Sequence, residues 1–395
     1  MTWSRIFSSM IRREAMQQVV ATNKPITHVA DVPMQGNIIR NFTPNWFATT
    51  MGTGILSVAL AQFPGHSWLF ATGQALWLFN ILLFATCTAL YAARWTRYFH
   101  EASRVFSHSV VSMFFGCIPM GLATIINGFL IYGIPHIGDT AVAIATTLWW
   151  IDVLMSLACG LAIPFMMFTR QSHSIDQMTA VWLLPIVASE VAAVSGGLLL
   201  PHIADAQTQL TVLMTSLVLW ACSVPLAMSV LVILFLRMAV HKLPHVNMAA
   251  SSWLALGPIG TGALGLLVMS QTGPAVLSAN GLAGVASAFG GASFLGAILL
   301  WGYGIWWLAT AVLITLRYLR EGLPFNIGWW GYTFPLGVFS VATLRLSTMV
   351  PMSAIAVFGA VLVAGLACMW LLVAAKTIKG AVDRSLFVSP CLKAD

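Results

Sequence analysis

Charged side chains are scarce in this sequence. Asp, Glu, Lys and Arg together make up 7% of the 395 residues, whereas 59% of the residues are hydrophobic and the mean hydropathy is +0.89. Too little polar surface remains to cover a soluble globule of this size. The composition therefore excludes an ordinary soluble protein and predicts a chain whose main solvent is lipid.

Ligand-like clusters of cysteine and histidine are also missing. The six cysteines form no CxxC pair, and five of them lie inside apolar runs, which argues against a disulfide framework and a thiolate metal site. No histidine lies well inside an apolar run, so paired haem ligands or the acid–base groups of a membrane-embedded enzyme are not indicated. We expect a protein without cofactor, metal or catalytic residues.

The basic residues that are present follow a regular pattern. Of the 18 Lys and Arg residues, 17 fall in the two termini and in every second loop between the apolar runs, and only Arg345 does not. This is the positive-inside pattern of a protein that crosses a bilayer many times. It predicts a multi-pass protein of the cell membrane with both termini in the cytoplasm. It also explains the net charge of +7, so nucleic-acid binding is not expected.

Ten apolar runs are each long enough to cross a hydrocarbon core, which needs about 20 helical residues. The predicted spans are 44–62, 67–93, 109–133, 141–169, 177–200, 208–236, 248–270, 286–316, 328–346 and 353–375. The sequence thus predicts an all-α membrane domain over 44–376, between a cytoplasmic arm, 1–43, and a cytoplasmic tail, 377–395. The start of the arm is either an amphipathic helix on the inner leaflet or disordered.

A proline–glycine motif recurs in alternate spans, with markers 66 to 77 residues apart. It is complete in the third, seventh and ninth spans and partial in the first and fifth. Its residues are Gly52, Gly54, Pro119, Gly121, Pro185, Pro258, Gly260, Pro335 and Gly337. Because proline bends a helix and frees a carbonyl that needs a partner in protein or water, five kinked odd-numbered helices are expected around a cavity, each paired with a smoother even-numbered helix. The alternative is that these residues serve close helix packing.

Two segments carry recognisable motifs: the opening of the first span, 41–54, reads NFTPNWFATTMGTG, and the block 329–337 reads WWGYTFPLG. Both segments resemble the tellurite-resistance/dicarboxylate transporter family. The resemblance extends from about Pro44 to Lys376, and the family includes fungal malate permeases, fungal sulfite efflux pumps and plant slow anion channels. It implies ten helices around a five-helix pore, transport of small anions, a homotrimer, and a pore-plugging phenylalanine that the motif places at Phe334. The fifth span lacks the motif glycine and plant-type regulatory extensions are absent, so gating by phosphorylation is not expected.

Three ionisable residues lie within the predicted spans, where a charge is costly unless it faces protein or water. Asp152 is expected to make a structural hydrogen bond or ion pair. Glu190 either pairs with a base such as Arg345 or accepts a proton and couples anion movement to the proton gradient. Arg345 either attracts the anion, because a guanidinium fork suits carboxylate or sulfite oxygens, or anchors the helix at the interface.

Together these features predict a transporter of small anions in the lipid bilayer. C4-dicarboxylates such as malate are the first candidate substrates. A sulfite efflux pump, or a chloride- or nitrate-type channel of the same fold, is the alternative.

Overall fold

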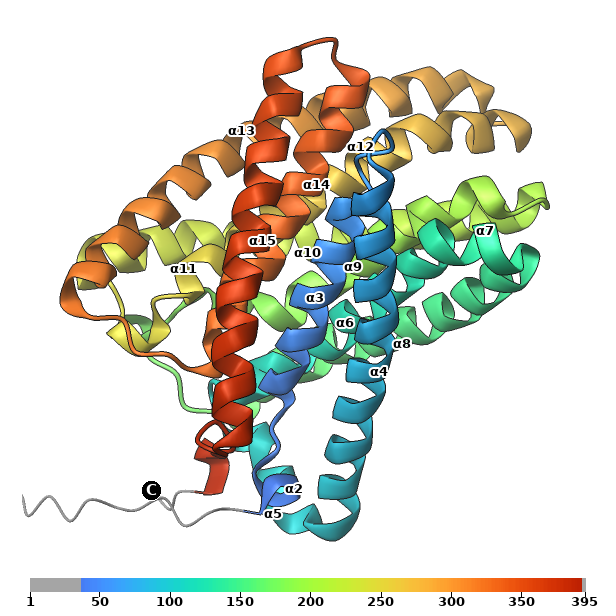
Figure 1. Ribbon diagram of the computed structural model, residues 1–395. Coiled ribbons are helices and arrows are strands. Elements are labelled where there is room, and N and C mark those ends of the chain that lie inside the picture. The colour runs from blue at the N-terminus through green and yellow to red at the C-terminus, as the bar shows by residue number, and fades with distance from the viewer. Residues whose placement is uncertain (1–36, 393–395) are drawn as a thin grey trace, which may run out of the picture. The chain divides into compact units, whose positions relative to one another are not determined.

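The computed structural model describes residues 37–392. The predicted N-terminal amphipathic helix and the rest of the arm up to residue 36 lie outside the described residues, as do residues 393–395. Between 37 and 392 the chain forms helices and no β-strand, which confirms the predicted all-α class (Figure 1).

Five long helices match the even-numbered predicted spans. They are α4 Ser67–Arg97, α8 Asp139–Thr169, α10 Ala206–His241, α13 Ala283–Glu321 and α15 Ser353–Val382. Large apolar side chains are exposed along them, for example Leu154 and Phe165 on α8 and Leu299 on α13. Such extended apolar faces are typical of helices in contact with lipid. Helix α15 continues to Val382, past the predicted domain end at 376, so Lys379 lies in this helix and not in the tail.

The odd-numbered predicted spans are each built in two parts. A short segment comes first and an α-helix follows: η1 Pro44–Phe47 and α3 Ala48–Leu60, η3 Val111–Gly116 and α6 Cys117–Gly128, η6 Ala180–Leu183 and α9 Leu184–Leu199, α11 Ser251–Leu254 and α12 Leu256–Ala279, η9 Ile327–Tyr332 and α14 Thr333–Met349. Among the described residues, eight helical stretches are long and apolar enough to cross a membrane; the first and last of these pairs are not counted among them.

The prolines of the motif start these α-helices rather than bend them in the middle, which corrects the predicted kinks. Pro185 is the second residue of α9, and Pro119, Pro258 and Pro335 are each the third residue of their helix. The change of helix type comes just before each proline. Because backbone N–H groups of the first turn have no acceptor within the helix, proline is tolerated there.

The motif glycines lie at close approaches between helices. Gly52 and Gly54 are inside α3, which is continuous, so the predicted break at these two residues is wrong. A Cβ at Gly54 would lie 2.7 Å from Asn80 Nδ2, and one at Gly337 would lie 2.6 Å from Ile55 Cγ1. A Cβ at Gly260 would lie 2.9 Å from the backbone nitrogen of Phe339. The alternative interpretation, close packing, therefore describes these glycines.

The α-helices α3, α6, α9, α12 and α14, here called the inner helices, form a closed circuit of contacts. Helix α3 packs on α6, α6 on α9, α9 on α12, α12 on α14, and α14 on α3 again. Each inner helix also packs on the long helix that follows it in the chain, as α3 does on α4 and α14 on α15 (Figure 1). In the most apolar stretch of the span that contains α9, 94% of the residues are buried, against 22% in α8.

The loops that carry the basic residues are joined to one another at one end of the helices. Gln171 donates a hydrogen bond to the carbonyl of Phe106 (2.8 Å), and Asn326 donates to the carbonyl of Asn247 (3.1 Å). Arg40 donates to both carboxylate oxygens of Glu101 at 2.7 Å, and these hydrogen bonds lower the pKa of that carboxyl. The even-numbered loops therefore share one face, as their common charge predicts.

The close approach of η3 to α9 generates a first prediction. A Cβ at Gly116 would lie 2.5 Å from the carbonyl carbon of Leu184, where only backbone can give way. We expect Gly116→Ala to destabilise the protein by about 1–3 kcal/mol, the usual cost of overpacking. The measurement is the apparent thermal midpoint in detergent.

Gly257→Ala is the matched control. Gly257 is the second residue of α12 and has no atom within 4 Å of a built Cβ, so alanine is expected to leave the midpoint unchanged or raise it through better helix propensity. Equal midpoints for the two variants would contradict the packing argument.

Candidate functional site

A cavity of about 200 Å³ lies between the five inner helices. All five contribute side chains to it, together with residues just beyond α3 and α6. The lining residues are Ile55, Val58, Gln62, Thr124, Asn127, Ile131, Val191, Val194, Leu198, Thr261, Leu264, Val268, Phe334, Val338, Val341 and Arg345. We call this the inner cavity.

The inner cavity carries one charge on otherwise neutral walls. Arg345 is the single ionisable side chain among its lining residues in the described chain, and most of the others are apolar. Arg345 lies eleven residues after Phe334 on α14, which is about 16 Å along a helix. A cavity of this kind attracts anions to a guanidinium without offering a carboxylate to repel them.

Several buried polar groups of the inner cavity have no hydrogen-bond partner within the described part of the chain. Thr124 donates to the carbonyl of Gly121 (2.7 Å), as hydroxyls in membrane helices commonly do. The hydroxyl of Thr261, Oδ1 of Asn127 and Nε of Arg345 make no such bond. Because buried polar groups are nearly always bonded, these three atoms are unused hydrogen-bonding positions within residues that line the cavity. The sequence interpretation missed Thr261 and Asn127.

A second cavity of about 570 Å³, here called the outer cavity, lies at the N-terminal ends of the inner helices. Along each helix its lining residues precede those of the inner cavity. Cys117 precedes Thr124 on α6 by seven residues, and Leu184 precedes Val191 on α9 by the same number. Seven residues correspond to about 10 Å of helix, so the two cavities follow each other along the inner helices.

Phe334 lies at the boundary between the two cavities. In the segment that leads into α14 the outer cavity reaches Gly331, and the inner cavity begins at Phe334; on α3 the corresponding residues are Met51 and Ile55. Phe334 is only 2% exposed. The boundary between the two cavities, here called the neck, is therefore bordered on the side of the inner cavity by the apolar side chains of Phe334 and Ile55.

Glu190 and Asp152 take no part in either cavity. Both are fully buried, and none of their carboxylate oxygens has a hydrogen-bond partner in the described residues. No ion pair joins Glu190 to Arg345 within residues 37–392, so the first of the two alternatives for Glu190 is not observed. The hydrogen bond or ion pair predicted for Asp152 is likewise not observed. Proton uptake by Glu190 stays a prediction.

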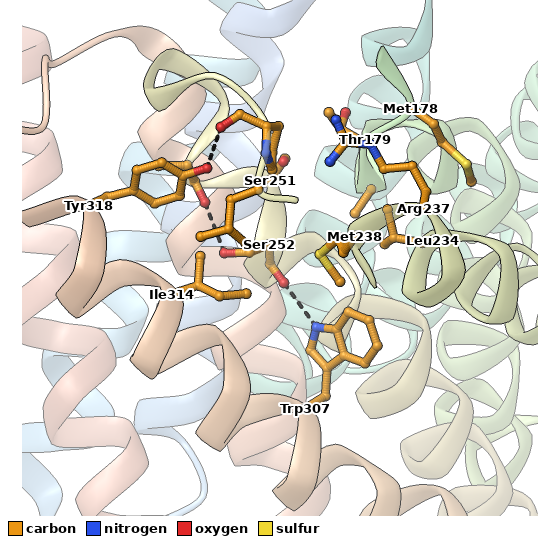
Figure 2. Close-up of a pocket in the computed structure, with 14 residues that line it drawn as sticks. Met178, Thr179, Leu234, Arg237, Met238, Ser251, Ser252, Trp307, Ile314 and Tyr318 are labelled. Atoms are coloured by element: carbon orange, nitrogen blue, oxygen red, sulfur yellow. Dashed lines mark hydrogen bonds between the residues drawn. The ribbon is translucent and has the colours of Figure 1, made fainter. Parts of the chain in front are cut away.

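A third pocket, between α10, α11 and α13, is a packing void (Figure 2). Trp307 donates from its indole nitrogen to the carbonyl of Ser252 (2.9 Å), and the hydroxyl of Tyr318 donates to the carbonyl of Pro244. Arg237 donates to the carbonyl of Lys242 at 2.6 Å. The free volume is about 10 Å³, room for one water at most. These contacts fasten a loop and leave no space for a substrate.

Comparison with known proteins adds evidence of family. The profile of a family described as voltage-dependent anion channel (SLAC1) matches residues 41–378. The sulfite efflux pump SSU1 of Arthroderma benhamiae is 36% identical over 357 residues, which are 88% of this chain and 93% of that protein. The malic acid transport protein of Schizosaccharomyces pombe is 25% identical over 346 residues, 85% of this chain and 77% of that protein.

These matches confirm the family resemblance of the two sequence motifs and extend it over nearly the whole membrane domain. The relatives are channels and transporters. The chain belongs to the SLAC1 family of voltage-dependent anion channels, and it is a multi-pass membrane protein of anion transport and not an enzyme.

Proposed function

We propose that this protein carries small oxyanions, with sulfite as the first candidate, across the cell membrane along the axis of the inner helices. The observation that carries the proposal is the inner cavity: five helices surround it, and its one ionisable side chain in the described chain is Arg345. In this proposal ten spans form five hairpins, and the basic loops and both termini lie in the cytoplasm.

Helix dipoles support an anion as the permeant species. The outer cavity is lined by residues at or before the first turns of the inner helices, for example Ala48, Cys117 and Leu184. Helix N-termini carry partial positive charge, so five of them around one cavity favour anions. Arg345 adds a full positive charge at the far end of the inner cavity. Weak, distributed attraction of this kind suits ions that must also leave.

The presence of a single guanidinium in the inner cavity favours sulfite over a dicarboxylate. A guanidinium fork binds one oxyanion group through two parallel hydrogen bonds. A C4-dicarboxylate such as malate would place its second carboxylate against apolar walls, with Thr261, Asn127, Thr124 and Gln62 as neutral partners. Desolvating a second charge there is costly. The similarity to named sulfite efflux pumps points the same way.

Malate is the second candidate, because the similarity to a malic acid transport protein covers 85% of this chain. Chloride or nitrate permeation remains the third alternative within the same proposal. A homotrimer in the membrane is proposed on the family resemblance alone, and native mass spectrometry of the detergent-solubilised protein tests it.

The direct test is flux of labelled sulfite, malate and nitrate into proteoliposomes of the purified protein, with and without a pH gradient. We expect sulfite to enter fastest. Faster malate than sulfite uptake would reverse the order of the candidates, and absence of flux for every anion would refute the proposed function. A dependence on the pH gradient would favour proton coupling, for which Glu190 is the proposed proton acceptor.

We further propose that the ring of Phe334 closes the neck between the cavities, where an apolar constriction blocks ions by excluding water. Phe334→Ala is therefore expected to raise the anion current about tenfold or more in planar bilayers. Phe339→Ala is the matched control, because Phe339 is a fully buried phenylalanine of the same helix that lines neither cavity and packs against Gly260 and Gly304. An equal rise in both variants would assign the effect to loosened packing.

Arg345 and Thr261 are proposed to bind the anion in the inner cavity. Arg345→Gln removes a charge-assisted hydrogen bond, so the half-saturating sulfite concentration should rise about tenfold or more, and Thr261→Val should raise it about two- to tenfold. Controls are Arg320→Gln, in the last turn of α13, and Thr343→Val, whose buried hydroxyl donates to the carbonyl of Phe339 and lines neither cavity. Unchanged saturation in the two site variants would remove these residues from the anion path.

A further inference from the structure

The chain reverses direction directly after α15. Ser385 donates to Oδ1 of Asp383 from both its backbone nitrogen (3.0 Å) and its hydroxyl (2.6 Å). Arg384, between them, has a φ of 61°, a left-handed conformation that residues other than glycine seldom adopt. The turn folds residues 383–392, here called the strap, against the end of the bundle that carries the basic loops.

The strap is anchored first on α15 itself. The backbone nitrogen of Leu386 donates to the carbonyl of Gly380 at 3.1 Å. The Leu386 side chain occupies the space in front of Gly380, where a Cβ would lie 2.6 Å from Leu386 Cγ. This contact fixes the start of the strap against the last turn of the helix.

A second anchor joins the strap to the first inner helix. The ring of Phe387 stacks on Trp46, with centroids 4.7 Å apart and planes inclined by 15°. Trp46 belongs to η1, which leads directly into α3, and it stacks in turn on Phe42 (5.6 Å). The strap therefore holds the entry to α3 through an aromatic stack.

A third anchor involves a buried arginine. Arg94, 1% exposed at the end of α4, donates to the hydroxyl of Ser389 (3.1 Å) and to the carbonyl of Phe42 (2.5 Å). Cys391, two residues after Ser389 and 8% exposed, packs with Val105 and Val111. Burial raises the pKa of the Cys391 thiol, which keeps it protonated and slow to react.

Between these anchors the strap forms part of the wall of the outer cavity, through Ser385, Leu386, Val388 and Pro390. It is also connected to the surroundings of the neck. Trp330, four residues before Phe334, donates to Thr377 on α15 (3.0 Å), one turn before Gly380. Gly52 of α3, beyond the Trp46 anchor, packs closely against Trp330 and Thr333.

We propose that the strap is an autoinhibitory latch: seated, it narrows the outer cavity and holds η1 and α15 against the segment that carries Phe334, and released, it opens the cavity and lets the neck widen. The inference rests on the proposed transport function. It gives the strap a regulatory role that is separate from the roles proposed for the pore residues.

The test follows both the position of the strap and the flux of anions. Cys391 is the reporter, in a protein whose other five cysteines are replaced by alanine, labelled with a maleimide in detergent where both faces are open to the reagent. Phe387→Ala, alone and with Ser389→Ala, should increase the labelling rate about tenfold and increase sulfite flux in proteoliposomes several-fold. Arg384→Gly, which favours the left-handed turn, should reduce both.

Val382→Ala is the matched control, because Val382, the last residue of α15, is 79% exposed, lines neither cavity and makes none of the anchoring contacts. It should change neither readout. Faster labelling with unchanged flux would overturn the inhibitory role, and unchanged labelling in the double variant would overturn the anchors. If no variant shows anion flux, only the proposed transport function is refuted. The labelling rates of Cys391 still decide whether the anchoring contacts hold the strap in place.

Discussion

The architecture depends on one constraint: backbone groups at membrane depth need partners, and irregular backbone is tolerated there only inside protein. The inner helices break this regularity five times, where a short segment passes into an α-helix. They can do so because the five long helices cover them, and because glycines let them approach closely at positions such as Gly54, Gly260 and Gly337. Close packing between neighbouring helices therefore permits the inner cavity between the five inner helices.

Much of this arrangement was predictable, because hydropathy and loop charge respond directly to the bilayer. The predicted spans agree with the observed helices to within a few residues at most ends, and the prolines of the repeated motif lie in the first turns of α6, α9, α12 and α14. The nature of the break was not predictable in the same way. Proline has no backbone N–H to donate, which is compatible both with a kink in the middle of a helix and with the first turn of a helix. The sequence alone therefore cannot distinguish these two positions for Pro119 or Pro335.

The site was less predictable than the fold, because it depends on the rotation of each helix about its axis. Glu190 and Arg345 are both on inner helices, yet only Arg345 lines the inner cavity. Thr261 was missed for a related reason. A threonine in an apolar run usually bonds its own helix, as Thr124 and Thr343 do, and nothing in the sequence separates these from one whose hydroxyl is left free.

The unpaired guanidinium of Arg345 has a consequence for how ions pass. No carboxylate among the lining residues of the described chain neutralises it, so its counter-ion has to be mobile. A vacant cavity would leave that charge uncompensated in surroundings of low polarity, which is unfavourable. Under the proposed transport function, occupancy of the cavity by one anion is the resting condition, and each arriving anion displaces the one already bound.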